Sequence, residues 1–276
     1  MGDLDGFAAL ITGGGSGIGL GAARRLIADG AVVTICGRGK QRLEDAVGEL
    51  GESARSIVAD VTDEGAVREA VAAACEATGK LDAVVACAGG SLHMGPLVLA
   101  DVEAFRATVD LNITGTFLTL KHAGPVMARH GGGSFVGISS IAGALTHRYL
   151  GAYCVGKAGI EMLVKVAADE LGPSHVRVNA IRPGLVDTEM VGMIKSTDAV
   201  LEDYHAQMPV SRVGTPADIA EAVRYLVGPE STWVTGQVFA VDGGHTLRRG
   251  PDYTPFAEPL YGADALRGLL PEEGAG

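Results

Sequence analysis

Short apolar runs alternate with helical stretches along most of this 276-residue chain, and this alternation restricts the fold more than any other feature. The runs lack the polar alternation of half-exposed strands, which favours strands buried on both faces. Strands that alternate with helices are typical of βαβ units in a parallel sheet. We therefore predict a Rossmann-type α/β fold, a doubly wound parallel β-sheet of about seven strands with helices on both faces. The apolar runs are 7–12, 32–36, 56–59, 83–87, 134–139, 176–181 and 237–241, and the helical stretches are 20–29, 39–50, 63–78, 101–129, 150–171 and 216–227.

Residues 1–245 are predicted to form one domain, because no internal repeat or low-complexity linker divides them and 47% of the chain is hydrophobic. An extension at 246–276 follows this domain. It contains four prolines together with Phe256, Leu260 and Tyr261, and it is too apolar for simple disorder. Contact with a neighbouring subunit, closure over a pocket and a frayed terminus are all compatible with this composition.

A glycine-rich turn at 13–19 joins the first predicted strand to the first helix. Glycines let the backbone turn tightly and approach a pyrophosphate, whose charge faces the free amides at the helix start. The spacing Thr-Gly-x-x-x-Gly-x-Gly, from Thr12 to Gly19, differs from the G-x-G-x-x-G fingerprint of other dinucleotide-binding folds. The turn residues predicted to bind the cofactor are Gly13, Gly15, Ser16, Gly17, Ile18 and Gly19.

Tyr153 and Lys157 lie four residues apart in a predicted helix, so their side chains share one face. A phenol titrates near ~10 in water, and we expect the nearby ammonium to lower that pKa. The hydroxyl of Ser140 can then hold a substrate oxygen beside the phenol, with Ser139 as the competing candidate. This set predicts proton transfer to or from a carbonyl or carbinol oxygen. Taken alone, the pair is also compatible with a half-buried tyrosine and a solvated lysine.

Further motifs stand at the ends of later strands or within a helix: Asp60-Val61, Ala88-Gly89, Asn112 and Pro183-Gly184. With these in order, the chain resembles the short-chain dehydrogenase/reductase family over roughly residues 5–245. The resemblance implies that Tyr153 gives or takes the proton, that Lys157 also holds the nicotinamide ribose, and that the spacing to the tyrosine selects Ser140. It further implies that the carbonyl of Asn112 holds a water connecting Lys157 to solvent, although a capping or solvated asparagine is an alternative.

The same resemblance implies a cofactor site at the carboxyl ends of the strands. Asp60 would hydrogen-bond the adenine amino group, since Asp63 is the better helix cap. The pair Ala88-Gly89 would leave room for a ribose. Cys87 replaces the asparagine usual in the family. In the family that asparagine mainly holds neighbouring backbone, so we expect the replacement to affect the stability of this loop and not the reaction. The remaining cofactor residues implied in this way are Val61, Pro183, Gly184, Val186 and Thr188, with the Val186 backbone and the Thr188 hydroxyl on the nicotinamide carboxamide.

The end of the second predicted strand bears on the choice of cofactor. NAD-binding enzymes place a carboxylate there, whereas this chain has Gly37 followed by Arg38. A guanidinium pairs well with a 2′-phosphate, so NADP(H) is favoured. Because Ser16 stands where some NADP enzymes carry a second basic residue, NAD(H) remains possible. A surface arginine that caps the next helix is the alternative for Arg38.

Residues 189–210 are longer and less periodic than a simple connector, which is typical of a mobile lid. Methionines and leucines near the predicted site favour an apolar, bulky small-molecule substrate. His93 and His147 are also compatible with ordinary surface positions. The candidate lining residues are Ser91, Leu92, His93, His147, Tyr149, Met190 and Met193.

A net charge of −11 argues against a general binder of nucleic acid or anionic membranes. The cysteines show no metal-ligand spacing, so we predict no metal site and core thiols in a reducing compartment. The N-terminus lacks the basic start of a signal peptide, and no segment is apolar for long enough to span a bilayer. We expect a cytoplasmic protein, and the family resemblance implies a homotetramer or homodimer.

The sequence therefore predicts an NAD(P)(H)-dependent oxidoreductase that transfers hydride between a nicotinamide and a secondary alcohol or ketone. A reductase of carbon–carbon double bonds in acyl thioesters is the first alternative, and Ser140 argues against it. A non-catalytic cofactor-binding sensor or scaffold is the second, and the complete set of Ser, Tyr, Lys and Asn argues against it. An epimerase or dehydratase acting on a nucleotide-sugar would need a larger C-terminal substrate domain.

Overall fold

The computed structural model describes residues 3–270, apart from the side chains of Met190, Met193 and Lys195. Seven strands form a sheet in the order β3-β2-β1-β4-β5-β6-β7, and every neighbouring pair is parallel. The predicted doubly wound α/β fold is confirmed by this order. The strands are β1 (Ala8–Thr12), β2 (Val32–Gly37), β3 (Ala54–Val58), β4 (Ala83–Ala86), β5 (Gly133–Ile138), β6 (Val176–Pro183) and β7 (Val238–Val241).

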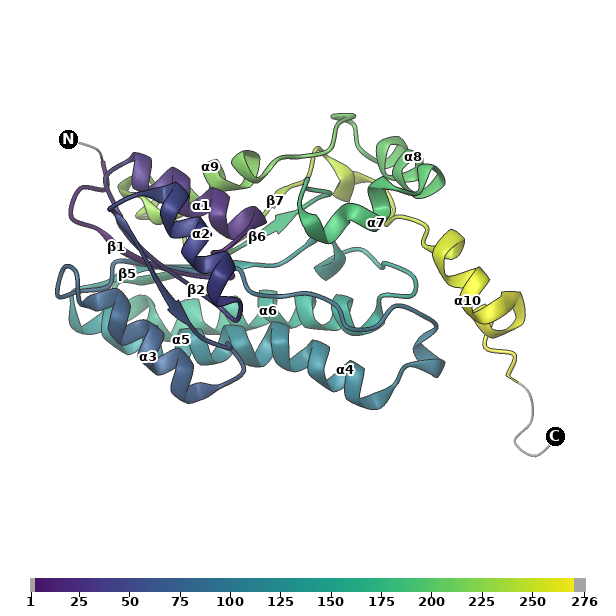
Figure 1. Ribbon diagram of the computed structural model, residues 1–276, viewed down its shortest axis with the longest axis horizontal. Helices are drawn as coiled ribbons and strands as arrows, with labels where there is room; N and C mark the ends of the chain where they lie inside the picture. Colours follow the sequence, from purple (N-terminus) through teal and green to yellow (C-terminus); the bar gives the residue numbers. More distant parts are fainter. Residues whose placement is uncertain (1–2, 271–276) are drawn as a thin grey trace.

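Helices cover both faces of the sheet (Figure 1), with α1, α2 and α9 on one side and α3, α4, α5 and α6 on the other. One buried apolar cluster packs Leu26 of α1 and Val223 of α9 against the sheet. A second packs Met127 of α5 and Val164 of α6 against the opposite face. The helices are α1 (Gly17–Ala28), α2 (Lys40–Leu50), α3 (Glu64–Cys75), α4 (Val102–Val109), α5 (Gly115–Arg129), α6 (Gly151–Leu171), α7 (Gly192–Lys195), α8 (Asp198–Gln207), α9 (Pro216–Val227) and α10 (Thr254–Leu266).

Capping chemistry in the sequence fixes where two of these helices begin. The side chain of Asp63 accepts a hydrogen bond from the amide of Ala66 at 2.9 Å and so caps α3, as predicted. Thr215 and Asp218 form a reciprocal capping box at the start of α9. Because Asp63 supplies the cap of α3, Asp60 is left for another role.

The order in which the chain adds strands to the sheet changes direction between β1 and β4. From β1 the chain moves outward to β2 and β3, then returns past β1 to β4 and continues to β7. Loops from β1 and β4 therefore leave toward opposite faces and open a crevice at the carboxyl ends of these strands. In open parallel sheets this crevice is where ligands bind.

Several local predictions differ from the structure. The edge strands β3 and β7 are partly exposed, so two-sided burial holds only for the inner strands. The predicted helix at 101–129 is divided by a π-helical turn over Asp110–Thr114. Helices α7, α8 and α10 were not predicted, because these segments lack a strong apolar period. Only Cys36 among the four thiols is fully buried.

Short 3-10 helices complete the secondary structure, and the final residues of the predicted extension, 271–276, lie outside the described residues. Within residues 3–270, no helix has both the length and the apolar character needed to cross a bilayer. The 3-10 helices are Leu97–Leu99, Ile141–Gly143, Gly172–Ser174, Glu189–Val191, Pro229–Ser231 and His245–Leu247.

Candidate active site

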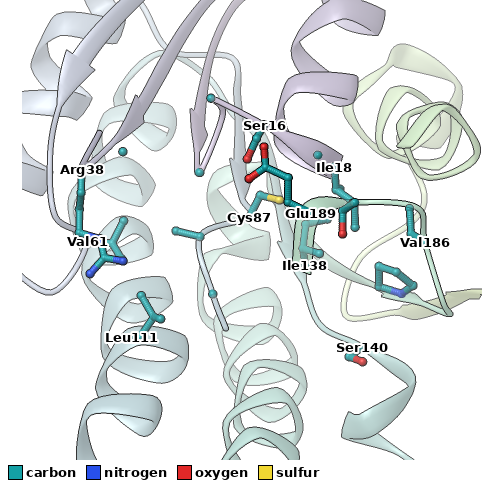
Figure 2. Close-up of a pocket in the computed structure, with 18 of the residues that line it drawn as sticks. Ser16, Ile18, Arg38, Val61, Cys87, Leu111, Ile138, Ser140, Val186 and Glu189 are labelled. Atoms are coloured by element: carbon teal, nitrogen blue, oxygen red, sulfur yellow. The ribbon is translucent and has the colours of Figure 1, made fainter. Parts of the chain in front are cut away.

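A groove of about 810 Å³ lies at the carboxyl ends of the central strands and gathers most of the predicted site residues. Figure 2 shows Arg38 and Ser140 at opposite sides of it, with Ser16 and Glu189 between them. Of the predicted residues, Gly19 and Asn112 do not line the groove. Those that do are Gly13, Gly15, Ser16, Gly17, Ile18, Arg38, Asp60, Val61, Ala88, Gly89, Ser140, Tyr153, Lys157, Pro183, Gly184, Val186 and Thr188.

The glycine turn has a backbone that only glycine accommodates at several positions. Gly13 and Gly17 have positive φ angles of 65° and 52°. A Cβ at Gly19 would lie 2.4 Å from the carbonyl oxygen of Gly13, so this glycine closes the turn onto α1 without facing the groove. The turn and the free amides at the start of α1 form a cradle that fits a pyrophosphate.

Thr12 connects the glycine turn to the loop that follows β4. Its hydroxyl accepts hydrogen bonds from the amides of Cys87 and Ala88, both at 3.1 Å. Burial raises the pKa of the Cys87 thiol to about 11, so this thiol is neutral at physiological pH. The loop after β4 is thus held through its backbone, and Cys87 in place of asparagine leaves that link intact.

The two adjacent serines have different roles. Ser139 is buried, and its hydroxyl lies 3.1 Å from the carbonyl oxygen of Lys157 and 2.9 Å from the carboxylate of Glu161. Both serines line the groove, but Ser140 accepts a hydrogen bond from the amide of Ala142 at 3.1 Å and shares a side-chain hydrogen bond with Tyr153. The geometry therefore favours Ser140 over Ser139 as the hydroxyl that faces a substrate.

Helix α6 brings Tyr153 and Lys157 to one face, as the spacing predicts. The ammonium of Lys157 lies 5.5 Å from the centroid of the Tyr153 ring and donates a hydrogen bond to the carbonyl of Ile138 at 2.9 Å. Burial lowers the pKa of Lys157 from 10.5 to about 8. Burial also raises the pKa of Tyr153, partly offset by the hydrogen bond with Ser140. The phenol pKa is therefore not lowered as expected, since the ammonium faces the ring and Ile138 rather than the hydroxyl.

Asn112 lies in the π-helical turn and is fully buried, so the capping and solvated alternatives are wrong. Its side-chain amide donates to the carbonyls of Gly90 and Thr108 at 2.7 and 2.8 Å. Its main-chain carbonyl accepts the hydroxyl of Thr116 at 2.7 Å. A Cβ at Gly89 would lie 2.7 Å from the Asn112 side-chain oxygen and 2.9 Å from the Lys157 ammonium, so a larger residue at this position would clash with both.

The adenosine end of the groove combines predicted and unpredicted residues. Hydrogen bonds from Thr62, assisted by the charge of Arg38, hold the pKa of Asp60 below its usual range. Arg42 also lines the groove and forms an ion pair of 3.0 Å with Glu189 of the predicted lid. The position of Arg42, four residues after Arg38, was the available signal for it. Further groove residues that the sequence analysis did not assign are Leu43, Ala59, Leu111, Ile138 and Val191.

The other end of the groove is closed by the segment after β6. The amide of Gly184 donates to the carbonyl of Val241 at 3.0 Å, and Val186 pairs with Gly214 in an isolated parallel bridge. A Cβ at Gly17 would lie 3.1 Å from the methyl group of Thr188. Thr188 therefore lies against the glycine turn, and its contact with a nicotinamide carboxamide stays a prediction.

The predicted substrate-lining residues divide into two groups. Ser91 and Leu92 are exposed, whereas Tyr149 packs beside Ile141 in a separate apolar cluster next to the groove. His147 is 5% exposed, so a surface position is wrong for it. The ring nitrogen Nε2 of His93 is buried with no hydrogen-bond partner among the described residues. The side chains of Met190 and Met193 lie outside the described ones.

Comparison with known proteins identifies the family. A family model described as enoyl-(acyl carrier protein) reductase matches residues 13–246. Cis-4-hydroxycyclohexanecarboxylate dehydrogenase from Sinomonas cyclohexanicum is 36% identical over 240 residues, covering 86% of this chain and 96% of its own. Galactitol 2-dehydrogenase (L-tagatose-forming) from Cereibacter sphaeroides is 36% identical, covering 88% and 96%. A short-chain type dehydrogenase/reductase from Mycobacterium ulcerans superposes with a TM-score of 0.95 at 48% identity, covering 97% and 99%. The chain belongs to the short-chain dehydrogenase/reductase family.

Proposed function

We propose that this protein is an oxidoreductase that transfers hydride between NADP(H) and a secondary alcohol or ketone. The observation that carries the proposal is the convergence of Ser140, Tyr153 and Lys157 at one end of a groove whose other parts fit a dinucleotide. When bound there, the nicotinamide would supply the hydride or accept it. The protein itself would then have to position the substrate oxygen and move one proton.

The side chains have distinct tasks in this proposal. Ser140 donates a hydrogen bond to the substrate oxygen, and Tyr153 transfers the proton to or from it. Lys157 holds its ammonium beside the phenol and contributes hydrogen bonds to the ribose. Asn112 fixes the loop after β4 through Gly90 and stands next to Lys157, where it completes the path for the proton.

Preference for NADP(H) over NAD(H) is supported by the charges at the end of β2. Gly37 occupies the position where a carboxylate would accept ribose hydroxyls, and Arg38 and Arg42 both line this part of the groove. Guanidinium groups match a phosphate in charge and geometry. NAD(H) remains the second cofactor to test, because Asp60 lies close enough to Arg38 to compete for its charge.

The proposed substrate class is a largely apolar alcohol or ketone, more compact than the bulky substrate expected from the sequence. Apolar side chains such as Leu185 and Tyr149 gather in one cluster with Ile141, the residue that follows Ser140. One relative is a dehydrogenase named for a hydroxylated cyclohexane ring, which agrees with this class. The description of the matching family model supports enoyl-thioester reduction as a second candidate. Ser140, hydrogen-bonded to Tyr153, favours a carbonyl oxygen instead.

A homotetramer is proposed from two separate apolar surfaces. Val155, Met162 and Val166 are exposed along one face of α6, and Phe117 is exposed on α5. Trp233, before the edge strand β7, is 99% exposed. Two self-complementary surfaces generate a tetramer, and one alone generates a dimer. We also propose that residues 1–245 act as one cofactor-binding domain in the cytoplasm, where free thiols such as Cys36 stay reduced.

Cofactor binding and turnover test the proposed function together. Nicotinamide fluorescence should increase on addition of the protein to NADPH, with a lower Kd than for NADH. The protein should then oxidise NADPH in the presence of at least one cyclic or branched ketone and should not reduce acyl-thioester double bonds. Failure to bind either dinucleotide would contradict the proposal, and preferential reduction of an enoyl thioester would favour the second candidate.

A further inference from the structure

The C-terminal extension is fastened to its own chain by polar contacts at its beginning. Arg249 forms an ion pair with Asp203 of α8, and the amide of Asp252 donates to the same carboxylate at 2.8 Å. Arg248 donates to the carbonyl of Ala206, also in α8. Figure 1 shows α10 at the same end of the molecule as α7 and α8. The extension is thus anchored to α8, the longest helix of the predicted lid.

The same extension reaches the two loops that flank the reacting residues. A Cβ at Gly250 would lie 2.1 Å from the carbonyl oxygen of Thr146, so the extension packs directly on the loop before α6. The hydroxyl of Tyr261 donates to the carbonyl of Met94 at 3.0 Å, in the loop after β4. Its ring fills the space that a Cβ at Gly95 would need. The extension therefore spans all three segments predicted to surround a substrate.

Tyr253 is the large side chain that the extension contributes to the buried core. It is 5% exposed, and its hydroxyl lies 2.8 Å from that of Tyr204, which is 4% exposed. Its ring centroid lies 6.2 Å from that of His147, in the loop between Ser140 and Tyr153. The phenols of Tyr204 and Tyr253 therefore form a buried pair between α8 and the loop that leads into α6.

The surrounding cluster connects this pair to the groove. Tyr253 belongs to the same apolar cluster as Ile141, which follows Ser140, and Leu150, which precedes α6. Val191 lies in this cluster and also lines the groove. Burial raises the pKa of Tyr253 to about 12, so this phenol is neutral at physiological pH. Tyr253 is therefore a buried side chain in the cluster that reaches the groove at Val191, and its ring contacts the loop between Ser140 and Tyr153 through His147.

We propose that residues 249–261 form a wall of the substrate site within the same chain, and that Tyr253, positioned by Tyr204, limits the size of the substrate. This inference rests on the proposed function, because it assigns a selectivity determinant for the same reaction. The bulk of the ring excludes large substituents beside the reacting carbon. The hydrogen bond to Tyr204 keeps the ring in place, since a buried hydroxyl without a partner is costly.

Selectivity between a compact and a bulky ketone tests the inference. The full-length Tyr253→Ala variant should raise the ratio of kcat/KM for decalone to that for cyclohexanone by about 10-fold or more. The Kd for NADPH should stay within about twofold, because Tyr253 does not line the cofactor groove. Leu269→Ala is the matched control, since Leu269 is exposed in the same extension but lies beyond the proposed wall, and it should leave the ratio unchanged.

Conservative variants keep the test decisive if the alanine variant does not fold. Tyr253→Leu should raise the same ratio by a smaller factor of about threefold. Tyr253→Phe should raise it less than Tyr253→Leu does, because the ring remains but loses the hydrogen bond to Tyr204 that positions it. If the wild type is active and both Tyr253→Ala and Tyr253→Leu keep its ratio of kcat/KM values, the role of Tyr253 is wrong, whereas the proposed function still stands. A wild type that binds NADPH but reduces neither these nor other ketones would overturn the proposed function and this inference with it.

Discussion

The ammonium of Lys157 lies 5.5 Å from the centre of the Tyr153 ring, on the same face of α6 and one turn further along the helix. The helix alone sets this relationship, because residues four apart share a face. The position of the ammonium also depends on a neighbouring strand, because Lys157 donates a hydrogen bond to the carbonyl of Ile138 at the end of β5. The pair is therefore a helix motif held against the end of a strand, in the groove where Ser140 also lies.

Removing the phenol hydroxyl should abolish turnover while leaving the groove intact. Tyr153→Phe is expected to lower kcat by about 10²–10⁴-fold, because the proton then has no positioned donor or acceptor. The Kd for NADPH, measured by nicotinamide fluorescence, should change little. Tyr225→Phe, at an exposed tyrosine of α9, is the control and should retain full activity. Substantial activity in Tyr153→Phe would show that another group transfers the proton.

Lys157→Met should stabilise the cofactor-free protein at neutral pH although it removes activity. The folded-state pKa of Lys157 is about 8, below its ordinary 10.5, so burial of the ammonium opposes folding below pH 8. This cost, about 3 kcal/mol in full, disappears as pH rises from 8 to 10.5. Loss of the hydrogen bond to Ile138 offsets about 1 kcal/mol. Denaturant unfolding should therefore show the variant more stable by about 2 kcal/mol at pH 7.

The difference in free energy of unfolding between Lys157→Met and the wild type should shrink as pH rises from 8 to 10.5. Comparison with the wild type at each pH cancels the titration of cysteines and tyrosines that both proteins share. A variant that is less stable than the wild type at pH 7 would mean that Lys157 stabilises the folded state as a charged group.

Two glycine substitutions should have opposite effects. Gly19→Ala places a methyl group 2.4 Å from the carbonyl oxygen of Gly13, so it should cost about 1–3 kcal/mol of stability and weaken NADPH binding. Gly48→Ala lies within α2 with no atom near its Cβ, so it should stabilise by about 0.5–1 kcal/mol. Thermal unfolding with and without NADPH measures both. If NADPH raised the unfolding temperature of Gly19→Ala as much as that of the wild type, the glycine turn would not be part of the cofactor site.

Arg38→Asp tests the choice of cofactor. Loss of a charge-assisted hydrogen bond of about 1.5–3 kcal/mol should raise the Kd for NADPH by roughly 10–100-fold. The Kd for NADH should stay the same or fall, because the new carboxylate can accept ribose hydroxyls. Arg55→Asp, at an exposed position of β3 outside the groove, controls for the change in net charge. Unchanged NADPH affinity in Arg38→Asp would remove the basis for the preference.

Local patterns predicted the sheet and most of the groove because each motif follows a strand. The turn from Gly13 to Gly19, the pair Ala88-Gly89 and Thr188 all fall at carboxyl ends of parallel strands, and topology then brings them together. No contact between distant residues had to be known for this. Tyr153 was identified differently, from its helical spacing to Lys157, and the family resemblance selected Ser140 by its spacing to Tyr153.

Features that depend on distant contacts were not predictable in this way. The direction of the Tyr153 pKa shift depends on burial and on where Lys157 points. The pairing of Tyr253 with Tyr204 joins the extension to α8, and nothing in either segment indicates the other. The π-helical turn at Asn112 was hidden within a continuous helical pattern. These interactions are long-range, so spacing along the chain carries no signal for them.

Transfer of a labelled hydride tests the central claim most directly. The protein would be incubated with a ketone from the panel and NADPH carrying deuterium at both positions of the reactive dihydronicotinamide carbon, and the alcohol would be analysed by mass spectrometry. The account predicts one carbon-bound deuterium in the alcohol, with no product from Tyr153→Phe. An alcohol without carbon-bound deuterium would contradict hydride transfer between the nicotinamide and the carbonyl carbon. So would an alcohol that gains carbon-bound deuterium at that carbon only in a second reaction, run with unlabelled NADPH in deuterated water.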